Sequence, residues 1–189
     1  NLSLNLLNDS VTEPALTVND EGTVKITSGG GNYIHATVGG APPENPSNPP
    51  IAHLQVFNSG TSLNGTGRLV IGGEGIGDLF VANGGHLTSA EARLGGVQPG
   101  TAAVGGDGSL WQTGSIAVGY GVIGTLSIEN GGRVDSNYAA VGFGSDSDGS
   151  LVTIGRAAPG GNPPALWTIE GDLTIGQGDS GLVDVLNGG

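Results

Sequence analysis

The stretch "GYGVIG" follows an apolar segment and places Gly119, Gly121 and Gly124 in the G-x-G-x-x-G spacing that cradles a dinucleotide pyrophosphate. That chemistry needs a helix after the third glycine, because the helix N-terminus supplies the N–H groups that hold the phosphates. The next residues are "TLSIENGG", whose alternation and Asn-Gly ending predict a strand and a turn. We therefore interpret the three glycines as corner residues and not as a nucleotide site.

The tetrapeptide "GDSG" around Ser180 is identical to the sequence around the nucleophile of trypsin-like proteases. A Ser-His-Asp triad is defined by the mutual geometry of three side chains and not by one tetrapeptide. The three histidines, His35, His53 and His86, have no triad-like residues around them in the sequence. We expect Ser180 to lie in a corner loop.

Asp146 and Asp148 in "DSDG" are the candidate ligands for a metal ion, which would be calcium because carboxylate oxygens suit it. The segment lacks the third acidic ligand and the terminal Glu of an EF-hand loop. "GGEGIGDLF" comes close to a calcium-binding nonapeptide but has one residue too many before Asp78. We interpret the segment with Asp146 and Asp148 as a solvated acidic loop and leave a surface calcium there open. No other cofactor is indicated.

Polysaccharide cleavage would need paired carboxylates at a cleft, or calcium-bound acids with a basic residue that abstracts a proton. The charged residues that qualify are scattered and form no clustered motif: Asp107, Asp135, Asp172, Asp184, Arg133 and Arg156. We therefore predict no catalytic residue in this chain.

Trp111 and Trp167 occupy the same position of a repeat, and an exposed indole ring is able to stack on a sugar. A tryptophan that recurs with a repeat more often packs at a corner, covering the core with its N–H facing water. We favour packing and keep both residues as alternative ligand contacts. Four other aromatic residues are too sparse in the sequence to predict a stacking platform: Tyr120, Tyr138, Phe80 and Phe143.

An internal repeat in the sequence indicates which secondary-structure elements carry these residues. The tripeptide Asn-Gly-Gly recurs at Asn83, Asn130 and Asn187, and the second interval is the longer because it contains a Pro-rich insertion. A finer series consists of an aliphatic residue followed by Gly, evenly spaced apart from two gaps that carry Pro-rich stretches: Val38, Ile71, Leu94, Val118, Val141 and Ile175. The unit is thus about 23 residues long, and it is doubled into a repeat of about 47 residues.

Segments such as "LSIENGGRV" alternate apolar and polar residues between Gly and Asn corners, which is typical of strand–turn–strand. A coil of three short strands cannot bury its own apolar side chains, whereas stacking the next coil about 4.8 Å away does so. We predict one all-β domain over residues 1–189, a single-stranded parallel β-helix. Residues 1–67 form irregular early coils with a Pro-rich loop at 41–50, and residues 68–189 form regular repeats with an insertion at 156–165.

The text "GSLWQTGSIAVGYGVIGTLSIENGGRV" and, more loosely, "ALWTIEGDLTIGQGDSGLVDVLNGG" resembles the repeat shared by autotransporter (type V secretion) passengers and PEP-CTERM surface proteins. The resemblance covers residues 68–189. It implies a right-handed β-helix displayed outside the bacterial cell, and it specifies a scaffold without specifying a function. Because the chain begins without Met and stops within a repeat, we expect it to be a piece of a longer protein.

The net charge and the composition limit the classes of binding partner that we expect for this chain. Seventeen acidic against five basic residues give a net charge of −12, which disfavours binding to nucleic acid and to anionic lipid. The absence of cysteine excludes disulfides, thiolate zinc sites and cysteine nucleophiles. No apolar run is long enough for this segment to insert into a membrane. The partners that remain are a glycan or protein of a host or environmental surface, and other solenoid coils of the same or a neighbouring chain.

The sequence thus predicts a non-catalytic structural or adhesive segment of an exported, extracellular bacterial cell-surface protein. Two alternatives stay open. One is a polysaccharide-binding or polysaccharide-cleaving β-helix protein, and the other is the subunit of an extracellular filament stacked end to end. The Pro-rich loops interrupt a regular scaffold, and such excursions are where we expect binding first.

Overall fold

The computed structural model describes residues 15–19, 22–40, 49–155, 163–187 and 189, and every regular element in them is a β-strand. All of the strand pairs are parallel, and the strands belong to two sheets. The predicted all-β class is therefore confirmed. No helix of the described residues is long and apolar enough to cross a membrane.

The first sheet, which we name sheet A, has the order β1-β4-β7-β9-β11-β13-β15, with β3, β6 and β16 pairing beside this path. Its strands are β1 (Ala15–Val18), β3 (Gly30–Tyr33), β4 (His35–Val38), β6 (Ser62–Gly65), β7 (Arg68–Ile71), β9 (His86–Leu94), β11 (Leu110–Val118), β13 (Arg133–Val141), β15 (Leu166–Ile169) and β16 (Leu173–Ile175). Sheet B has the order β17-β14-β12-β10-β8-β5-β2. Its strands are β2 (Thr23–Ile26), β5 (Ile51–Phe57), β8 (Ile76–Ala82), β10 (Gly100–Gly105), β12 (Gly124–Glu129), β14 (Ser150–Ile154) and β17 (Gly181–Val185).

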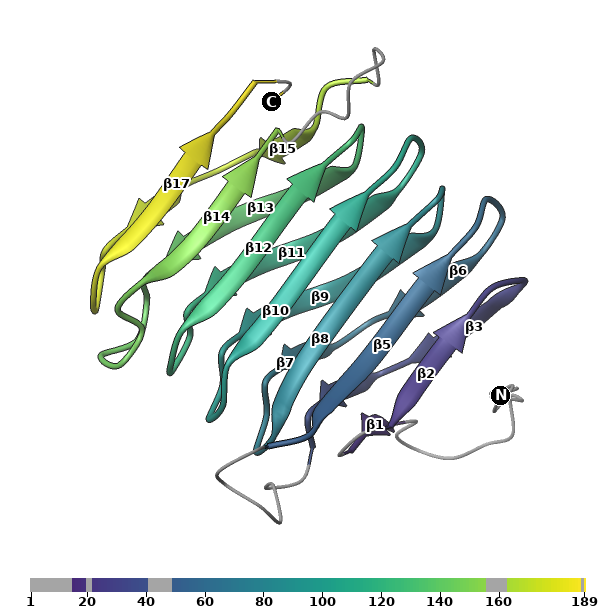
Figure 1. Ribbon diagram of the computed structural model, residues 1–189, viewed down its shortest axis with the longest axis horizontal. Helices are drawn as coiled ribbons and strands as arrows, with labels where there is room; N and C mark the ends of the chain where they lie inside the picture. The colour runs from purple at the N-terminus through teal and green to yellow at the C-terminus, as the bar shows by residue number, and fades with distance from the viewer. Residues whose placement is uncertain (1–14, 20–21, 41–48, 156–162, 188) are drawn as a thin grey trace.

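The two sheets form two layers, and the chain passes back and forth between them (Figure 1). From β8 to β14 each strand of one sheet is followed by a strand of the other, so the connection between two parallel neighbours is a strand of the opposite layer. Leu110 on β11 lies opposite His86 on β9 and Arg133 on β13, each of them one unit of the sequence repeat away. This arrangement is solenoid-like, and it differs from an antiparallel sandwich.

We call one circuit of the chain through both sheets a passage. The number of strands in a passage differs from the three that we expected. β6 and β7 both pair with the nine-residue strand β9, and β15 and β16 both pair with β13. In the middle of the molecule two short strands are thus joined into one. The joined strand β9 has two consecutive accessible residues at its centre, Ala90 and Glu91, where a regular alternation would bury one. The strand continues as one element there, although its pairing with β11 skips Ala90.

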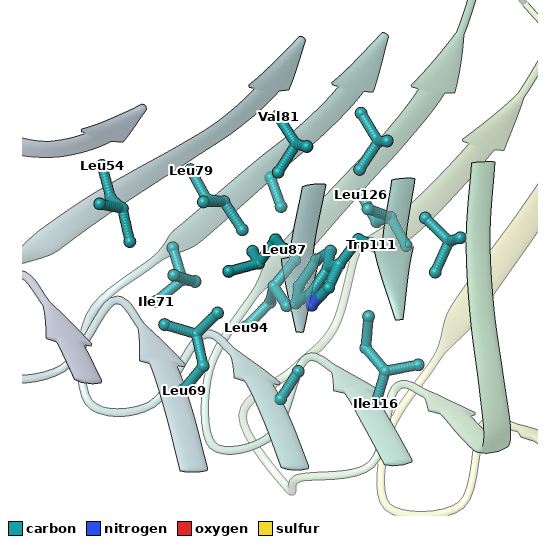
Figure 2. Close-up of a cluster of buried hydrophobic side chains, with 14 of the residues drawn as sticks. Leu54, Leu69, Ile71, Leu79, Val81, Leu87, Leu94, Trp111, Ile116 and Leu126 are labelled. Carbon is teal, nitrogen blue, oxygen red and sulfur yellow. The ribbon is translucent and has the colours of Figure 1, made fainter. Parts of the chain in front are cut away.

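The core lies between the sheets and consists of inward side chains stacked in register (Figure 2). On sheet A, Leu69 lies beside Ala92, Ala92 beside Ile116 and Ile116 beside Ala139. All four side chains are buried. Because each core side chain meets its counterpart in the next passage, burial requires stacking and a single passage has no core of its own.

The glycine of each aliphatic–Gly pair has a left-handed backbone, with φ between 71° and 80°: Gly39, Gly72, Gly95, Gly119, Gly142 and Gly176. A side chain is strained in this conformation, so glycine is the residue that turns the corner. The interpretation of Gly119 as a corner residue is confirmed. Gly124 begins strand β12 and no helix follows it, which excludes the nucleotide-cradle alternative.

Candidate functional site

The outer face of sheet A is hollowed where β11 and β13 approach the last strands of the sheet. One hollow, of about 420 Å³, is lined by polar side chains and is named the polar hollow here: Gln112, Arg133, Asp135, Asn137, Thr168 and Glu170. A second, of about 330 Å³, is named the aromatic hollow: Ser115, Ala117, Tyr120, Tyr138, Phe143 and Asp172. Gly114 and Asn137 line the first while Ser115 and Tyr138 line the second, so the two hollows adjoin.

Cross-strand register positions the side chains of the polar hollow. Gln112 lies between Thr88 and Asp135 on its two neighbouring strands, and Thr168 follows Asp135. Arg133 donates a hydrogen bond to Asp135 over 2.7 Å. That hydrogen bond and the carboxylate charge raise the pKa of the Arg133 guanidinium, so this cation stays charged at neutral pH.

Three aromatic rings form the walls of the aromatic hollow. The rings of Tyr120 and Phe143 are stacked, with their centroids 5.6 Å apart and their planes 9° from parallel. Tyr138 comes from β13, and its side chain is 58% exposed. Small residues such as Ala117 and Ala140 lie on the outward side of the sheet between these rings. The hollow therefore presents the exposed ring surface of Tyr138 and Phe143 beside small residues of the sheet.

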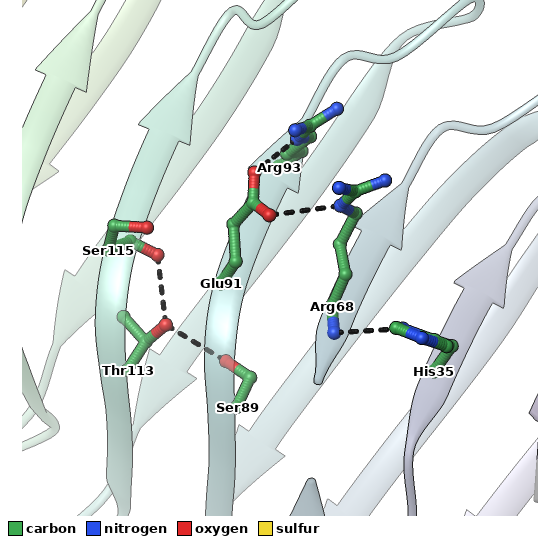
Figure 3. A network of polar contacts seen from close by, with 7 residues as sticks. All are labelled: His35, Arg68, Ser89, Glu91, Arg93, Thr113 and Ser115. Carbon is green, nitrogen blue, oxygen red and sulfur yellow. Dashed lines mark hydrogen bonds and ion pairs between the residues drawn. The ribbon is translucent and has the colours of Figure 1, made fainter. Parts of the chain in front are cut away.

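A run of paired charges approaches the aromatic hollow along the same face of the sheet (Figure 3). Glu91 accepts hydrogen bonds from Arg68 and Arg93, and the Arg93 guanidinium lies 3.8 Å from the centre of the Tyr120 ring. Burial raises the pKa of Glu91, but the two arginines outweigh it and the net effect lowers the pKa. Glu91 is therefore a fixed anion and not a proton donor at neutral pH.

A ladder of hydroxyl side chains, Ser89, Thr113 and Ser136, completes the lining of the polar hollow. Ser89 Oγ donates to Thr113 Oγ1 over 3.0 Å, and the Trp111 indole N–H donates to Ser89 over 3.3 Å. The Trp167 N–H makes the same kind of bond to Ser136, over 3.2 Å. All three hydroxyl residues are buried. Buried hydroxyl and indole groups thus pair with one another, which avoids the cost of leaving them unsatisfied.

No family model, no curated protein and no solved structure matches this chain. The resemblance to autotransporter and PEP-CTERM repeats therefore stays a prediction.

The two tryptophans kept as ligand contacts both lie on the core side of the sheet. Trp111 is 0% exposed, so it has no ring face open to a sugar. Its N–H bonds to Ser89 and does not face water, contrary to our expectation. Trp167 is half-buried and packs against the core two strands away, with Val134 between the two. The two tryptophans recur because they occupy the same inward-facing register of two strands in sheet A, where they pack against the core.

The calcium candidates, Asp146 and Asp148, are both exposed. Asp148 accepts a hydrogen bond from the hydroxyl of Ser180, the residue of the protease-like tetrapeptide. In the part of the chain that the structure describes, no group of three or more His, Cys, Asp and Glu residues is arranged to hold a metal ion. Two of the histidines have partners of their own, because His35 accepts a bond from the Arg68 backbone and His53 lies beside Asp78.

The charged residues considered above for polysaccharide cleavage lie at several different places in the structure. Arg133 and Asp135 lie in the polar hollow with Glu170, and Asp172 lies in the aromatic hollow. Asp184 is on β17 of sheet B, and Arg156 lies outside the described residues, as do 41–48 and 156–162 of the two Pro-rich loops. Two of the candidate aspartates, Asp135 and Asp172, thus line adjoining hollows, whereas Asp184 lies on the other sheet. Most of the two loops that we expected to bind lies outside the described residues.

The aromatic residues lie closer together than their sparse distribution in the sequence suggested. Tyr120 and Phe143 are one repeat unit apart in sequence and stacked in space, and Tyr138 lines the same hollow. That separation equals one passage through the two sheets, which is the spacing that brings residues into contact here. The repeat length itself was therefore the signal that would have found them. Phe80 lies apart, on β8 of sheet B.

Proposed function

We propose that the chain is a right-handed β-helix with coils of about 23 residues, and that it serves as a non-catalytic adhesive segment of an exported bacterial surface protein. The coil length has support from register, because Gly100 on β10 lies opposite Gly77 on β8 and Gly124 on β12, one repeat unit away on either side. The right-handed sense has support from the path in Figure 1. The chain runs along sheet B at the front, crosses to sheet A behind, and returns one position nearer the C-terminus.

The observation that carries the adhesive function is the pair of adjoining hollows on the outer face of sheet A. Each hollow is built from side chains at the same register of successive strands. Strands with many in-register partners hold their side chains rigidly, so little entropy is lost when a partner binds. A rigid, grooved face is suited to binding a surface.

The pairing of the cations supports a role without catalysis. Every Lys and Arg among the described residues has a partner: Arg68 and Arg93 contact Glu91, Arg133 contacts Asp135, and Lys25 lies 5.0 Å from the centre of the Phe57 ring. A proton-abstracting base needs a pKa tuned toward neutrality and an open approach to substrate. Paired, permanently charged arginines offer neither.

The test is an adhesion assay with beads that carry the purified chain, placed on surfaces coated with bacterial polysaccharide, mucin or matrix protein. We expect retention on at least one coating and no release of new reducing ends or unsaturated sugars from any polysaccharide. Beads coated with albumin are the control. Product release would overturn the non-catalytic assignment, and failure to adhere to every coating would overturn the adhesive one.

The exported location is tested separately. In the source cells, we expect protease added to intact cells to remove the chain, while a cytoplasmic marker enzyme survives. Survival of the chain until the cells are lysed would contradict export.

A filament is the second candidate, and one observation favours it. Core-register residues on the last strands are exposed, among them Ile175 on β16 and Val185 on β17, the latter at 62%. Stacking of a second copy, or of further coils of the same protein, against these strands would bury them. If this occurs, sedimentation velocity will show a concentration-dependent oligomer that Val185→Lys abolishes. A monomer at all concentrations would remove the filament alternative.

A further inference from the structure

We propose that the two hollows together bind an uncharged oligosaccharide, whose pyranose rings lie on the exposed rings of Tyr138 and Phe143. This inference rests on the proposed adhesive function, and it names the chemistry of the surface that is bound.

The aromatic walls indicate a ligand with a flat face of C–H bonds. An aromatic ring has a negative face, which attracts the weakly positive hydrogens on one side of a pyranose. Tyr138 is 58% exposed and Phe143 is 38% exposed, so both offer ring surface at the hollow. Tyr120 is held from its other side by Arg93, 3.8 Å from the ring, which fixes the stack before a ligand arrives.

The polar hollow supplies the complement to sugar hydroxyls. Gln112 and Asn137 carry amide groups that both donate and accept, and Thr168 carries a hydroxyl. Both amide side chains are exposed, and both line this hollow beside the aromatic one. A few placed polar groups beside apolar ring surface are typical of small-molecule and glycan sites. A purely apolar peptide would leave these groups without partners, which lowers its affinity.

The local charge excludes anionic saccharides and nucleic acid. Asp135 and Glu170 line the polar hollow and Asp172 lines the aromatic one. The cation of the site, Arg133, is already paired with Asp135 over 2.7 Å. A uronate or phosphate in the groove would face these carboxylates without a free cation. The charge of the site therefore selects a neutral chain.

The experiment is isothermal titration calorimetry of the full chain with neutral hexasaccharides of glucose, mannose, galactose and N-acetylglucosamine, and with hexagalacturonate. We expect at least one neutral hexasaccharide to bind, and hexagalacturonate to bind more weakly by about tenfold or more, equivalent to about 1.4 kcal/mol. Tyr138→Ala should weaken binding by about tenfold or more, because the exposed ring is a main contact. Phe80→Ala, an aromatic truncation on sheet B, should leave the affinity unchanged.

Binding of no neutral saccharide would overturn the inference, as would equal affinity of Tyr138→Ala and the parent chain. Preference for hexagalacturonate, or binding of an uncharged aromatic peptide at Tyr138 in place of any sugar, would also overturn it. Circular dichroism of each variant verifies its fold. If coated beads still adhere while no saccharide binds, this inference fails and the adhesive function stands. If the beads do not adhere either, the proposed function fails as well.

Discussion

Trp111 and Trp167 have the same side chain at the same register but differ in burial, which makes them a matched pair. Trp111→Ala removes a fully buried indole and leaves Ser89 without its donor, so we expect a loss of about 3–5 kcal/mol in the free energy of unfolding. Trp167 is half-buried, and its truncation should cost less than half as much. Urea unfolding measures both. Equal losses would show that Trp111 does not occupy the core as described.

Tyr33 predicts a decline of stability in alkali. Burial, opposed in part by a hydrogen bond with Ser89, raises the pKa of its phenol, which donates to the Thr88 carbonyl over 2.8 Å. The unfolded chain releases this proton above about pH 10, while the folded chain keeps it to higher pH. The contribution is therefore complete below about pH 10 and falls above it by about 1.4 kcal/mol per pH unit.

The measurement is urea unfolding at several values between pH 8 and pH 11, values chosen to bracket the tyrosine pKa of about 10. Tyr33→Phe should be less stable than the parent at pH 8, because the bond to Thr88 is lost, and its stability should depend less on pH above 10. Tyr138→Phe, on an exposed ring, should follow the parent. An unchanged alkaline slope in Tyr33→Phe would contradict this assignment.

At the scale of residues, the sequence predicted the conformations that depend on neighbouring residues in the chain. It missed many of the contacts that a residue makes with the next passage. Gly119 was interpreted correctly because an aliphatic residue and a strand flank it. The Tyr120–Phe143 stack was missed because its partners are a whole repeat unit apart and nothing local marks them. The inward-facing hydroxyl of Ser89 was missed for the same reason, since its partners Trp111 and Thr113 lie on another strand.

A corner requires glycine for two reasons, the strain of a left-handed backbone and the lack of space for a Cβ, and Gly29 and Gly95 allow the two to be measured separately. Gly29 has φ of 72° and nothing within 4 Å of an added Cβ, so Gly29→Ala should cost only the left-handed strain of about 1–2 kcal/mol. Gly95 has φ of 76°, and a Cβ there would collide with the Val122 carbonyl oxygen. Gly95→Ala should cost clearly more, because strain and collision add. Thermal unfolding of both variants compares them, and equal costs would contradict the close approach of successive corners.

At the scale of elements, alternation and Asn-Gly corners predicted strands and their limits well. Asn83 and Asn130, for example, adopt φ of 54° and 53° at the turns where the tripeptide placed them. The joined strands were not predicted. The sequence around Ala90 and Glu91 gives no sign that one strand continues through this position, because the strands that pair with β9 on either side of it belong to other parts of the chain. Pairing between passages, and not local propensity, decides where such a strand ends.

The whole molecule should lose structure from its ends. Each strand contacts mainly its neighbours in the same sheet, so stability sums over adjacent passages, as in other stacked repeats. β17 has a partner on one side only, whereas β10 and β12 have partners on both. We expect hydrogen exchange to be slowest in β10, β11 and β12 and fastest in the end strands β1, β2, β16 and β17. Amide exchange resolved by mass spectrometry measures this, and uniform protection along the chain would contradict it.

The register of the strands also bears on how such a molecule changes length over generations. A segment such as residues 95–118 runs from one position of a passage to the equivalent position of the next, because Leu94 lies beside Val118. Its excision would bring Leu94 beside Val141, an aliphatic side chain of the same kind at the same place. Its duplication would likewise set like against like. Recombination between neighbouring units in the gene would therefore lengthen or shorten the reach of the protein in whole steps, with no new core to invent.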